Sequence, residues 1–248
     1  MHIIIGASSG IGLEIAEELS IKKKDLILIS TDDRDLKAIA KDLTIRFGNK
    51  ISYKALKLED KFISDKFFKI IKSKKNIEAI YFVAGKNIID DYPAFNKNIE
   101  NKLHIFDVNF FSVIRIINKI NLQFLKNKKI NLVFFGSVTA KFGTYDKAIY
   151  ASSKRALESF FESLCSFSSK NFFLQFYILG EIKTNMVFDK KNRILSPVSP
   201  NKVAKTVLKN LNKNSYIAYY PKWWWLIKVF LNLIPFKFRY LLIRKFNN

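Results

Sequence analysis

The chain has 248 residues and a mass of 28.9 kDa, which fits one large α/β domain better than two small ones. Hydrophobic residues make up 49% of it and charged residues 26%, with 8 Gly and 5 Pro, so the composition excludes a disordered, collagen-like or low-complexity chain. One cysteine, Cys165, and two histidines are too few for an internal disulfide or a structural zinc site. We therefore expect a folded protein of a reducing cytoplasm.

The formal net charge is +22, from 43 Lys and Arg against 21 Asp and Glu. A basic surface attracts nucleic acid or an anionic membrane. The basic residues are scattered among many Ile, Asn and Phe, however, which fits a biased composition equally well, and no basic groove or nucleic-acid-binding module is recognisable. We expect no nucleic-acid partner. A strand pattern begins directly after Met1, so we also expect no export signal.

Short β-rich runs alternate with longer helical patterns along the chain. The expected strands are residues 2–5, 25–30, 51–57, 78–83, 130–136, 172–178 and 215–219. The expected helices are residues 10–20, 33–47, 61–73, 98–125, 149–168 and 201–212. Four of the strands are nearly continuous apolar runs, which is typical of a sheet covered on both faces. This order predicts an α/β fold: a doubly wound parallel sheet of about seven strands with helices on both faces, in a domain of residues 1–220, followed by a tail of residues 221–248.

A glycine-rich turn, GASSGIG, occupies residues 6–12 between the first strand and the first helix. Glycines let a backbone approach a pyrophosphate closely, and a helix start presents free N–H groups and the positive end of its dipole. The spacing is G-x-x-x-G-x-G rather than G-x-G-x-x-G, and a tight turn made only for packing is the alternative. The turn favours a phosphate-binding site at the end of the first strand.

A phenol and an amine stand four residues apart, at Tyr150 and Lys154, in a strongly helical segment. This spacing places both on one face of the helix, where a cation lowers the pKa of a neighbouring phenol. Ser137 directly follows the strand expected at 130–136, and ligands of open parallel sheets bind at the carboxyl ends of strands. Ser137 is therefore expected to reach the same crevice and to hydrogen-bond a carbonyl oxygen. A Tyr-x-x-x-Lys pair taken alone is more often a solvated helix face.

Together with Asn109 in a DVNF segment, these motifs resemble the short-chain dehydrogenases/reductases over residues 1–212, and the 13-residue separation of Ser137 and Tyr150 fits that family. The resemblance implies a Rossmann-type fold, an NAD(P)(H) cofactor and interconversion of a carbonyl and a secondary alcohol. It implies that Tyr150 donates the proton and that Ser137 positions and polarises the carbonyl. Lys154 would bind the nicotinamide ribose and lower the pKa of Tyr150, and Asn109 would hold a water in a proton relay.

The resemblance also implies a set of cofactor-binding residues: Gly6, Ser8, Ser9, Gly10, Ile11, Gly12, Ala84, Gly85, Tyr150, Lys154, Ile182 and Thr184. The chain departs from the family pattern at Ile5, where Thr is usual, at the FVAG segment that replaces Asn-Asn-Ala-Gly, and at Leu179, which replaces Pro. These departures concern residues that brace loops rather than reacting groups.

The second strand ends in Ser30 and Thr31, with two aspartates just beyond. NAD enzymes place an acid at the end of this strand for the ribose 2′-OH, and NADP enzymes offer Arg or Lys for the phosphate. Neither signature is present, so NAD and NADP stay open. Glu59 or Asp60 either contacts the adenine or is an acidic helix N-terminus.

The tail has no Asp or Glu from residue 190 onward, and the three tryptophans are consecutive at 223–225. The apolar run from Trp223 to Ile234 is well short of the roughly 20 residues that span a bilayer. Residues 221–246 therefore predict a peripheral amphipathic anchor on an anionic membrane, with Lys228 and later basic residues facing lipid. Packing over the substrate crevice or in a subunit interface is the alternative.

The YYPKW segment at residues 219–223, followed by LIPF at 233–236, resembles the tails of the reductases that act with the decaprenylphosphoryl-ribose oxidase on a lipid-linked keto-pentose. This resemblance implies a reductase on the cytoplasmic face of the membrane with a lipid-linked keto-sugar substrate. The alternatives are a 3-oxoacyl-[acyl carrier protein] reductase and, from another class, a nucleotide-sensing binding module that no longer reacts. Family members assemble through the helices expected at 98–125 and 149–168, so a homodimer or homotetramer is implied.

Overall fold

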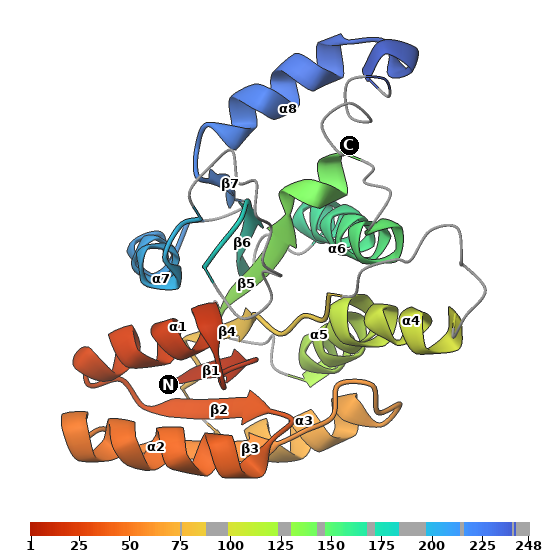
Figure 1. The fold of residues 1–248 in the computed structure, drawn as a ribbon. Helices are drawn as coiled ribbons and strands as arrows, with labels where there is room; N and C mark the ends of the chain where they lie inside the picture. Colours follow the sequence, from red (N-terminus) through yellow and green to blue (C-terminus); the bar gives the residue numbers. More distant parts are fainter. Residues whose placement is uncertain are drawn as a thin grey trace.

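The computed structural model describes residues 1–74, 76–87, 99–123, 130–142, 147–167, 172–183, 197–213, 216–239 and 241. The described strands form one parallel sheet in the order β3-β2-β1-β4-β5-β6-β7 (Figure 1). They are β1 (His2–Ile5), β2 (Leu26–Ser30), β3 (Ile51–Ala55), β4 (Ala79–Phe82), β5 (Ile130–Ser137), β6 (Phe172–Leu179) and β7 (Tyr216–Tyr220). The predicted α/β fold, a parallel sheet of seven strands with helices around it, is confirmed.

Helices cover both faces of this sheet. One face packs against α1 (Gly10–Ile21), α2 (Asp33–Phe47) and α7 (Pro200–Lys209), and the other packs against α3 (Ile63–Ile71), α5 (Ser112–Gln123) and α6 (Ala148–Phe167). The remaining helical segments are α4 (Ile99–Phe106), a π-helical turn η1 (Asp107–Phe111), a 3₁₀ turn η2 (Val138–Lys141) and α8 (Trp224–Leu233). None of the described helices is both long enough and apolar enough to pass through a membrane.

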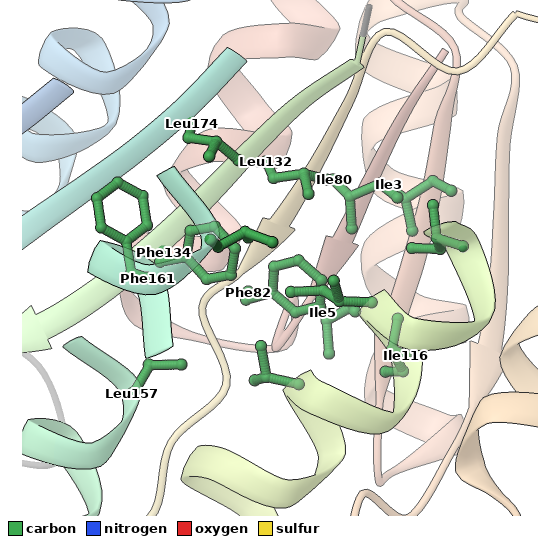
Figure 2. Close-up of a cluster of buried hydrophobic side chains, with 14 of the residues drawn as sticks. Ile3, Ile5, Ile80, Phe82, Ile116, Leu132, Phe134, Leu157, Phe161 and Leu174 are labelled. Carbon is green, nitrogen blue, oxygen red and sulfur yellow. The ribbon is translucent and has the colours of Figure 1, made fainter. Parts of the chain in front are cut away.

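The strands are continuously apolar because alternate side chains enter two different cores. Ile3 and Ile5 belong to the core under α3, α5 and α6, whereas Ile4 between them belongs to the opposite core. Figure 2 shows the first of these cores, where the rings of Phe82 and Phe134 stack with their centroids 5.1 Å apart. A polar residue on either face of these central strands would therefore be buried.

The winding direction of the sheet reverses between β1 and β4. From β1 the chain first builds outward through β2 to β3, and it then returns to place β4 on the other side of β1. In open α/β sheets, ligands bind outside the carboxyl ends of the strands at such a switch point. Gly6 follows β1 and Ala84 lies two residues beyond β4, so both lie at this point.

The helix predicted over residues 98–125 is not regular. A π-helical turn at Asp107–Phe111 separates α4 from α5, and Asn109 lies at its centre. Such turns are rare and are found frequently at functional sites. The periodicity of the apolar residues predicted the helical segment correctly, but it does not reveal one residue wound into a wider turn.

Candidate active site

The glycine turn brings the ends of β1 and β4 into direct contact. Gly6 has a φ of 95°, and a Cβ added to it would lie 2.5 Å from the backbone nitrogen of Ala84. A Cβ on Gly12 would overlap the carbonyl of Gly6. Glycine is therefore required at both positions, by close approach of the backbone and, at Gly6, by a left-handed conformation.

The first turn of α1 has backbone donors that no side chain caps. Its N-cap residue, Ser9, makes no side-chain capping hydrogen bond, and the first turn contains no acidic residue. The N-terminus of a helix in this state offers N–H groups and a positive dipole end to an anion. The turn at residues 6–12, with Ser8, Gly10 and Ile11 in it, thus fits the pyrophosphate of a dinucleotide.

The end of β2 differs from the start of α1, because the Asp32 side chain beyond β2 already caps the next helix, α2. The Asp32 carboxylate accepts hydrogen bonds from the backbone N–H groups of Arg34 at 2.8 Å and Asp35 at 3.2 Å, which caps α2 and lowers the pKa of Asp32. The hydroxyls of Ser8 and Ser30 lie 2.8 Å apart and link the glycine turn to the end of β2. This end of the site thus presents hydroxyls, and the choice between NAD and NADP stays open.

Ser137 and Tyr150 meet at the carboxyl end of β5. Ser137 is the last residue of β5 and Tyr150 lies in the first turn of α6. The Ser137 hydroxyl is near enough to the Tyr150 phenol to act on its pKa. Lys154 lies one helical turn further along α6 and is only 5% exposed. The structure therefore brings the three predicted catalytic residues to one end of the sheet.

Lys154 is a buried cation beside the switch point. Its ammonium donates a hydrogen bond of 3.0 Å to the carbonyl of Phe135 in β5. Burial lowers the pKa of Lys154 to about 8, so the side chain still carries most of its charge at neutral pH. Gly85 faces it, because a Cβ at Gly85 would lie 3.2 Å from the Lys154 nitrogen and 3.3 Å from the Asn109 Oδ1.

The phenol of Tyr150 does not have the lowered pKa that the sequence predicted. Burial raises the pKa of Tyr150, and the hydrogen bond from Ser137 opposes this only in part. The expected lowering needs the Lys154 ammonium to act on the phenol, yet the hydrogen bond recorded for this ammonium goes to the backbone of β5. Desolvation of the phenol therefore dominates.

Asn109 braces the segment that follows β4. Its amide accepts a hydrogen bond of 2.8 Å from the backbone N–H of Lys86 and donates one of 3.0 Å to the carbonyl of the same residue. It also donates to the Ser153 hydroxyl at 2.9 Å, which connects it to the residue before Lys154. The expected proton relay stays a prediction, and the observed bonds fix the backbone near Ala84 and Gly85.

Two further predicted cofactor residues follow β6. Ile182 is buried and forms an isolated parallel bridge with Val198. Thr184 lies outside the described residues, and so does most of the segment from Met186 to Pro200 expected to select the substrate. At the adenine end, the Glu59 carboxylate forms an ion pair with Lys86, and Asp60 pairs with Lys66 and accepts from the Phe62 N–H.

Sequence reasoning missed two residues at this end of the sheet. The Thr139 hydroxyl lies 2.8 Å from the Ser137 hydroxyl, and the backbone N–H of Thr139 donates to Ser137 at 3.3 Å. A hydroxyl two residues after a strand-terminal serine was the available signal. The second, Trp224, packs its indole against Gly180, and nothing in a run of three tryptophans distinguishes the one that faces inward.

The fold and the site together define an α/β protein with a glycine turn that leads into an uncapped helix N-terminus and a Ser-Tyr-Lys group at the ends of its strands. The chain matches the short chain dehydrogenase family over residues 1–193. It belongs to this family.

Several known proteins are similar to the chain. It is 30% identical over 193 residues to a 3-oxoacyl-[acyl-carrier-protein] reductase, FabG, of Buchnera aphidicola subsp. Acyrthosiphon pisum, covering 77% of this chain and 76% of that protein. It is 27% identical over 164 residues to human retinol dehydrogenase 8, covering 65% of this chain and 52% of that protein. The chain thus matches only about half the length of this second relative.

Solved structures share the fold at low sequence identity. A short-chain dehydrogenase from Sphingobium yanoikuyae in complex with NADPH has a TM-score of 0.80 at 18% identity, covering 89% of this chain and 87% of that chain. A short chain dehydrogenase/reductase from Burkholderia phymatum in complex with NAD has a TM-score of 0.76 at 14% identity, covering 88% and 87%. These likenesses support the architecture of the sheet and its helices.

Proposed function

We propose that this chain is an NAD(P)H-dependent oxidoreductase that interconverts a carbonyl and a secondary alcohol. The observation that carries the proposal is the convergence of Ser137, Tyr150 and Lys154 at the carboxyl end of β5. A hydroxyl that can hold a carbonyl oxygen, a phenol that can give a proton and a buried cation are the groups that carbonyl reduction needs.

In the direction of reduction, Ser137 holds the substrate carbonyl oxygen and Tyr150 transfers its proton to that oxygen. In this structure the Lys154 ammonium bonds to the backbone of β5. We propose that in the cofactor-bound enzyme its charge, retained at neutral pH because its pKa is about 8, acts on the phenol and stabilises the phenolate that Tyr150 becomes. The cofactor supplies the hydride when it is bound. Asn109 fixes the segment after β4 beside Lys154, and we propose that proton exchange with solvent runs along this side of the site.

The cofactor is held by the same residues that the sequence predicted. The glycine turn at residues 6–12 would take the pyrophosphate, Ala84 and Gly85 would also contact the cofactor, and Lys154 would bind the nicotinamide ribose. Ile182 and Thr184 hold the carboxamide. Similar proteins are described with NADPH and with NAD, and the hydroxyls at the end of β2 favour neither, so the proposal covers NAD(P)(H) as a class.

The substrate we propose is a lipid-linked keto-sugar at the cytoplasmic face of a membrane. Residues 1–220 form the catalytic unit, and residues 221–248 form a basic, aromatic tail that contacts the lipid surface. The absence of acidic residues from position 190 onward and the exposed apolar side chains of α8 support this part of the proposal. Homodimers or homotetramers through the segment of α4 and α5 and through α6 belong to the same proposal.

A 3-oxoacyl-[acyl carrier protein] reductase is the second candidate. The 30% identity to the Buchnera reductase favours it, and a chain with a net charge of +22 suits an acidic carrier protein. A non-catalytic nucleotide sensor is the third, and the gathering of Ser137, Tyr150 and the buried Lys154 at one strand end argues against it.

Cofactor oxidation by the purified protein tests these candidates together. NADH and NADPH would each be followed with polyprenyl-phosphate keto-sugars, with 3-oxoacyl thioesters and with simple ketones, with and without phospholipid. We expect the highest kcat/KM with the lipid-linked keto-sugar in the presence of lipid. A higher kcat/KM with the thioesters would assign the second candidate, and binding of cofactor without oxidation by any carbonyl would support the sensor.

A further inference from the structure

The helix α8 has two faces of different environment. Its half-buried residues recur at helical spacing and are Trp224, Ile227, Lys228 and Leu231. The opposite face is apolar and exposed: Trp225 at 52%, Leu226 at 61%, Val229 at 37%, Phe230 at 62% and Leu233 at 79%. Apart from Lys228 and Asn232, α8 is apolar, and the residues that the structure describes cover only one of its faces. An apolar helix face is usually covered by a partner.

The inner face is built into the active-site end of the sheet through Trp224. Ser137 and Leu179 are partners in the register of β5 and β6, and Gly180 follows Leu179. The Trp224 indole occupies the space that a Cβ on Gly180 would need.

Trp224 makes a second contact, with the segment that follows Ser137 in the chain. The rings of Trp224 and Phe142 lie with their centroids 6.2 Å apart, and Phe142 directly follows the 3₁₀ turn η2, which begins next to Ser137. The N–H of Gly180 also donates to the Tyr220 carbonyl at 2.9 Å, so the base of α8 is tied to the end of β6. Trp224 therefore touches both segments that extend from the strand ends beside Ser137.

The charges around the outer face select the chemistry of its partner. Lys222, Lys237 and Arg239 flank it, and the chain has no carboxylate in residues 190–248. Lys228 is different from the sequence-based expectation: it is half-buried, and its charge acts on the buried Lys141, which places it toward the body of the protein rather than toward lipid.

A second copy docked face to face through α8 would bring its own Lys222, Lys237 and Arg239 against these residues, whereas an anionic bilayer supplies the opposite charge. Ten residues of helix reach only about 15 Å, half of a hydrocarbon core, so α8 lies along the surface. Figure 1 shows α8 at one edge of the molecule, beyond β7.

We propose that the outer face of α8, continued by Phe236 and Phe238, docks on an anionic lipid bilayer while Trp224 on the inner face lines the substrate site, which therefore opens at the lipid surface. This inference rests on the proposed function, which identifies the substrate site. It adds to that function the surface through which the substrate arrives.

The three tryptophans make the test direct, because the chain contains no others. One variant, Trp223→Phe with Trp224→Phe, leaves Trp225 as the only fluorophore, and its matched control, Trp223→Phe with Trp225→Phe, leaves Trp224. Each is titrated with phosphatidylcholine vesicles and with vesicles containing phosphatidylglycerol, in both cases with brominated acyl chains that quench buried indoles.

We expect Trp225 to be quenched by the anionic vesicles, with binding about tenfold or more tighter than to neutral ones and weakened by salt. Trp224 should be quenched far less, and its emission should change when NADPH or NADH is added without lipid. Equal quenching of the two indoles, or none at either, would overturn the two-faced docking, and self-association through α8 in its place would assign the surface to a second copy. Vesicle quenching of Trp225 without any response of Trp224 to cofactor would keep the docking and remove the link to the substrate site.

Discussion

At the scale of single residues, Lys154 makes the stability of the protein depend on pH. Burial lowers its pKa from 10.5 to about 8, and its charge is held mainly by one carbonyl. Between these two values the unfolded chain binds more protons than the folded one, so this residue makes the free energy of unfolding rise as the pH rises. The folded protein thus tolerates at neutral pH a charge that destabilises it, as expected of a group kept for chemistry.

The variant Lys154→Met should remove this pH dependence. From pH 7.5 to pH 9.5, the free energy of unfolding of the wild type should gain about 2 kcal/mol relative to the variant. Urea unfolding of both proteins at the two pH values measures this difference. If the difference in unfolding free energy between the two proteins were the same at both pH values, or changed in favour of the variant as the pH rose, Lys154 would not be buried as a cation.

Thr139 offers a second test at this scale. Its hydroxyl lies 2.8 Å from that of Ser137, and we expect it to orient the hydroxyl that holds the substrate carbonyl. Thr139→Val should lower kcat by about five- to tenfold, the worth of one neutral hydrogen bond, with the cofactor Kd little changed. Thr139→Ser should restore kcat. If Ser and Val behaved alike, the loss would reflect packing rather than the hydroxyl.

At the scale of elements, the glycine turn shows what can and cannot be substituted. A Cβ at Gly12 would overlap the backbone carbonyl of Gly6, which cannot move without displacing the turn, whereas a Cβ at Gly48 would meet nothing within 4 Å. Gly48 nevertheless has a φ of 71°, because it ends α2 in the left-handed conformation. A side chain at Gly12 is therefore excluded by lack of room, whereas a side chain at Gly48 is disfavoured by the backbone conformation.

Gly12→Ala should abolish cofactor binding and cost more than about 2 kcal/mol in unfolding free energy, because backbone atoms must separate. Its matched control, Gly48→Ala, should cost about 1 kcal/mol through strain at positive φ and leave cofactor binding unchanged. Titration of NADPH and NADH fluorescence with chemical unfolding measures both effects. Normal cofactor affinity in Gly12→Ala would remove the turn from the binding site.

The elements also separate what the sequence can predict from what it cannot. The strands were predictable because their apolar runs enter two cores. Ser137 was predictable because it follows a strand, and Tyr150 and Lys154 because their four-residue spacing places them on one helix face. That the three act together came from the resemblance to the family. The π-helical turn at Asn109 was not predictable, because its partner, Lys86, is 23 residues away in sequence. Long-range contacts of this kind leave no local periodicity.

The raised pKa of Tyr150 and the inward position of Trp224 have the same origin. Both depend on what surrounds a side chain after folding. The phenol of Tyr150 is desolvated, and the indole of Trp224 fills the space that the missing Cβ of Gly180 leaves. Composition and spacing predict which groups are present near a site, and burial then decides how they behave.

At the scale of the whole molecule, the candidate site residues lie at one end of the sheet, the carboxyl ends of the strands. The glycine turn and the end of β4 meet at the switch point, Ser137 and Tyr150 meet at the end of β5, and Trp224 brings the base of α8 to the end of β6. The proposed lipid contact lies at the same end because α8 is tied to β6 there. The sites that we propose for the cofactor, the substrate and the membrane therefore lie at neighbouring strand ends.

The most direct test of the central claim is hydride transfer by the wild type and by Tyr150→Phe. Each protein would be mixed with deuterium-labelled NADPH or NADH and with the carbonyl compound most active in the substrate panel, and deuterium in the alcohol product would be measured together with the Kd of the cofactor. We predict labelled alcohol from the wild type and a rate of deuterium transfer about a hundredfold or more lower in Tyr150→Phe. The cofactor Kd should be nearly equal in the two proteins. Transfer by Tyr150→Phe at the wild-type rate would contradict the account.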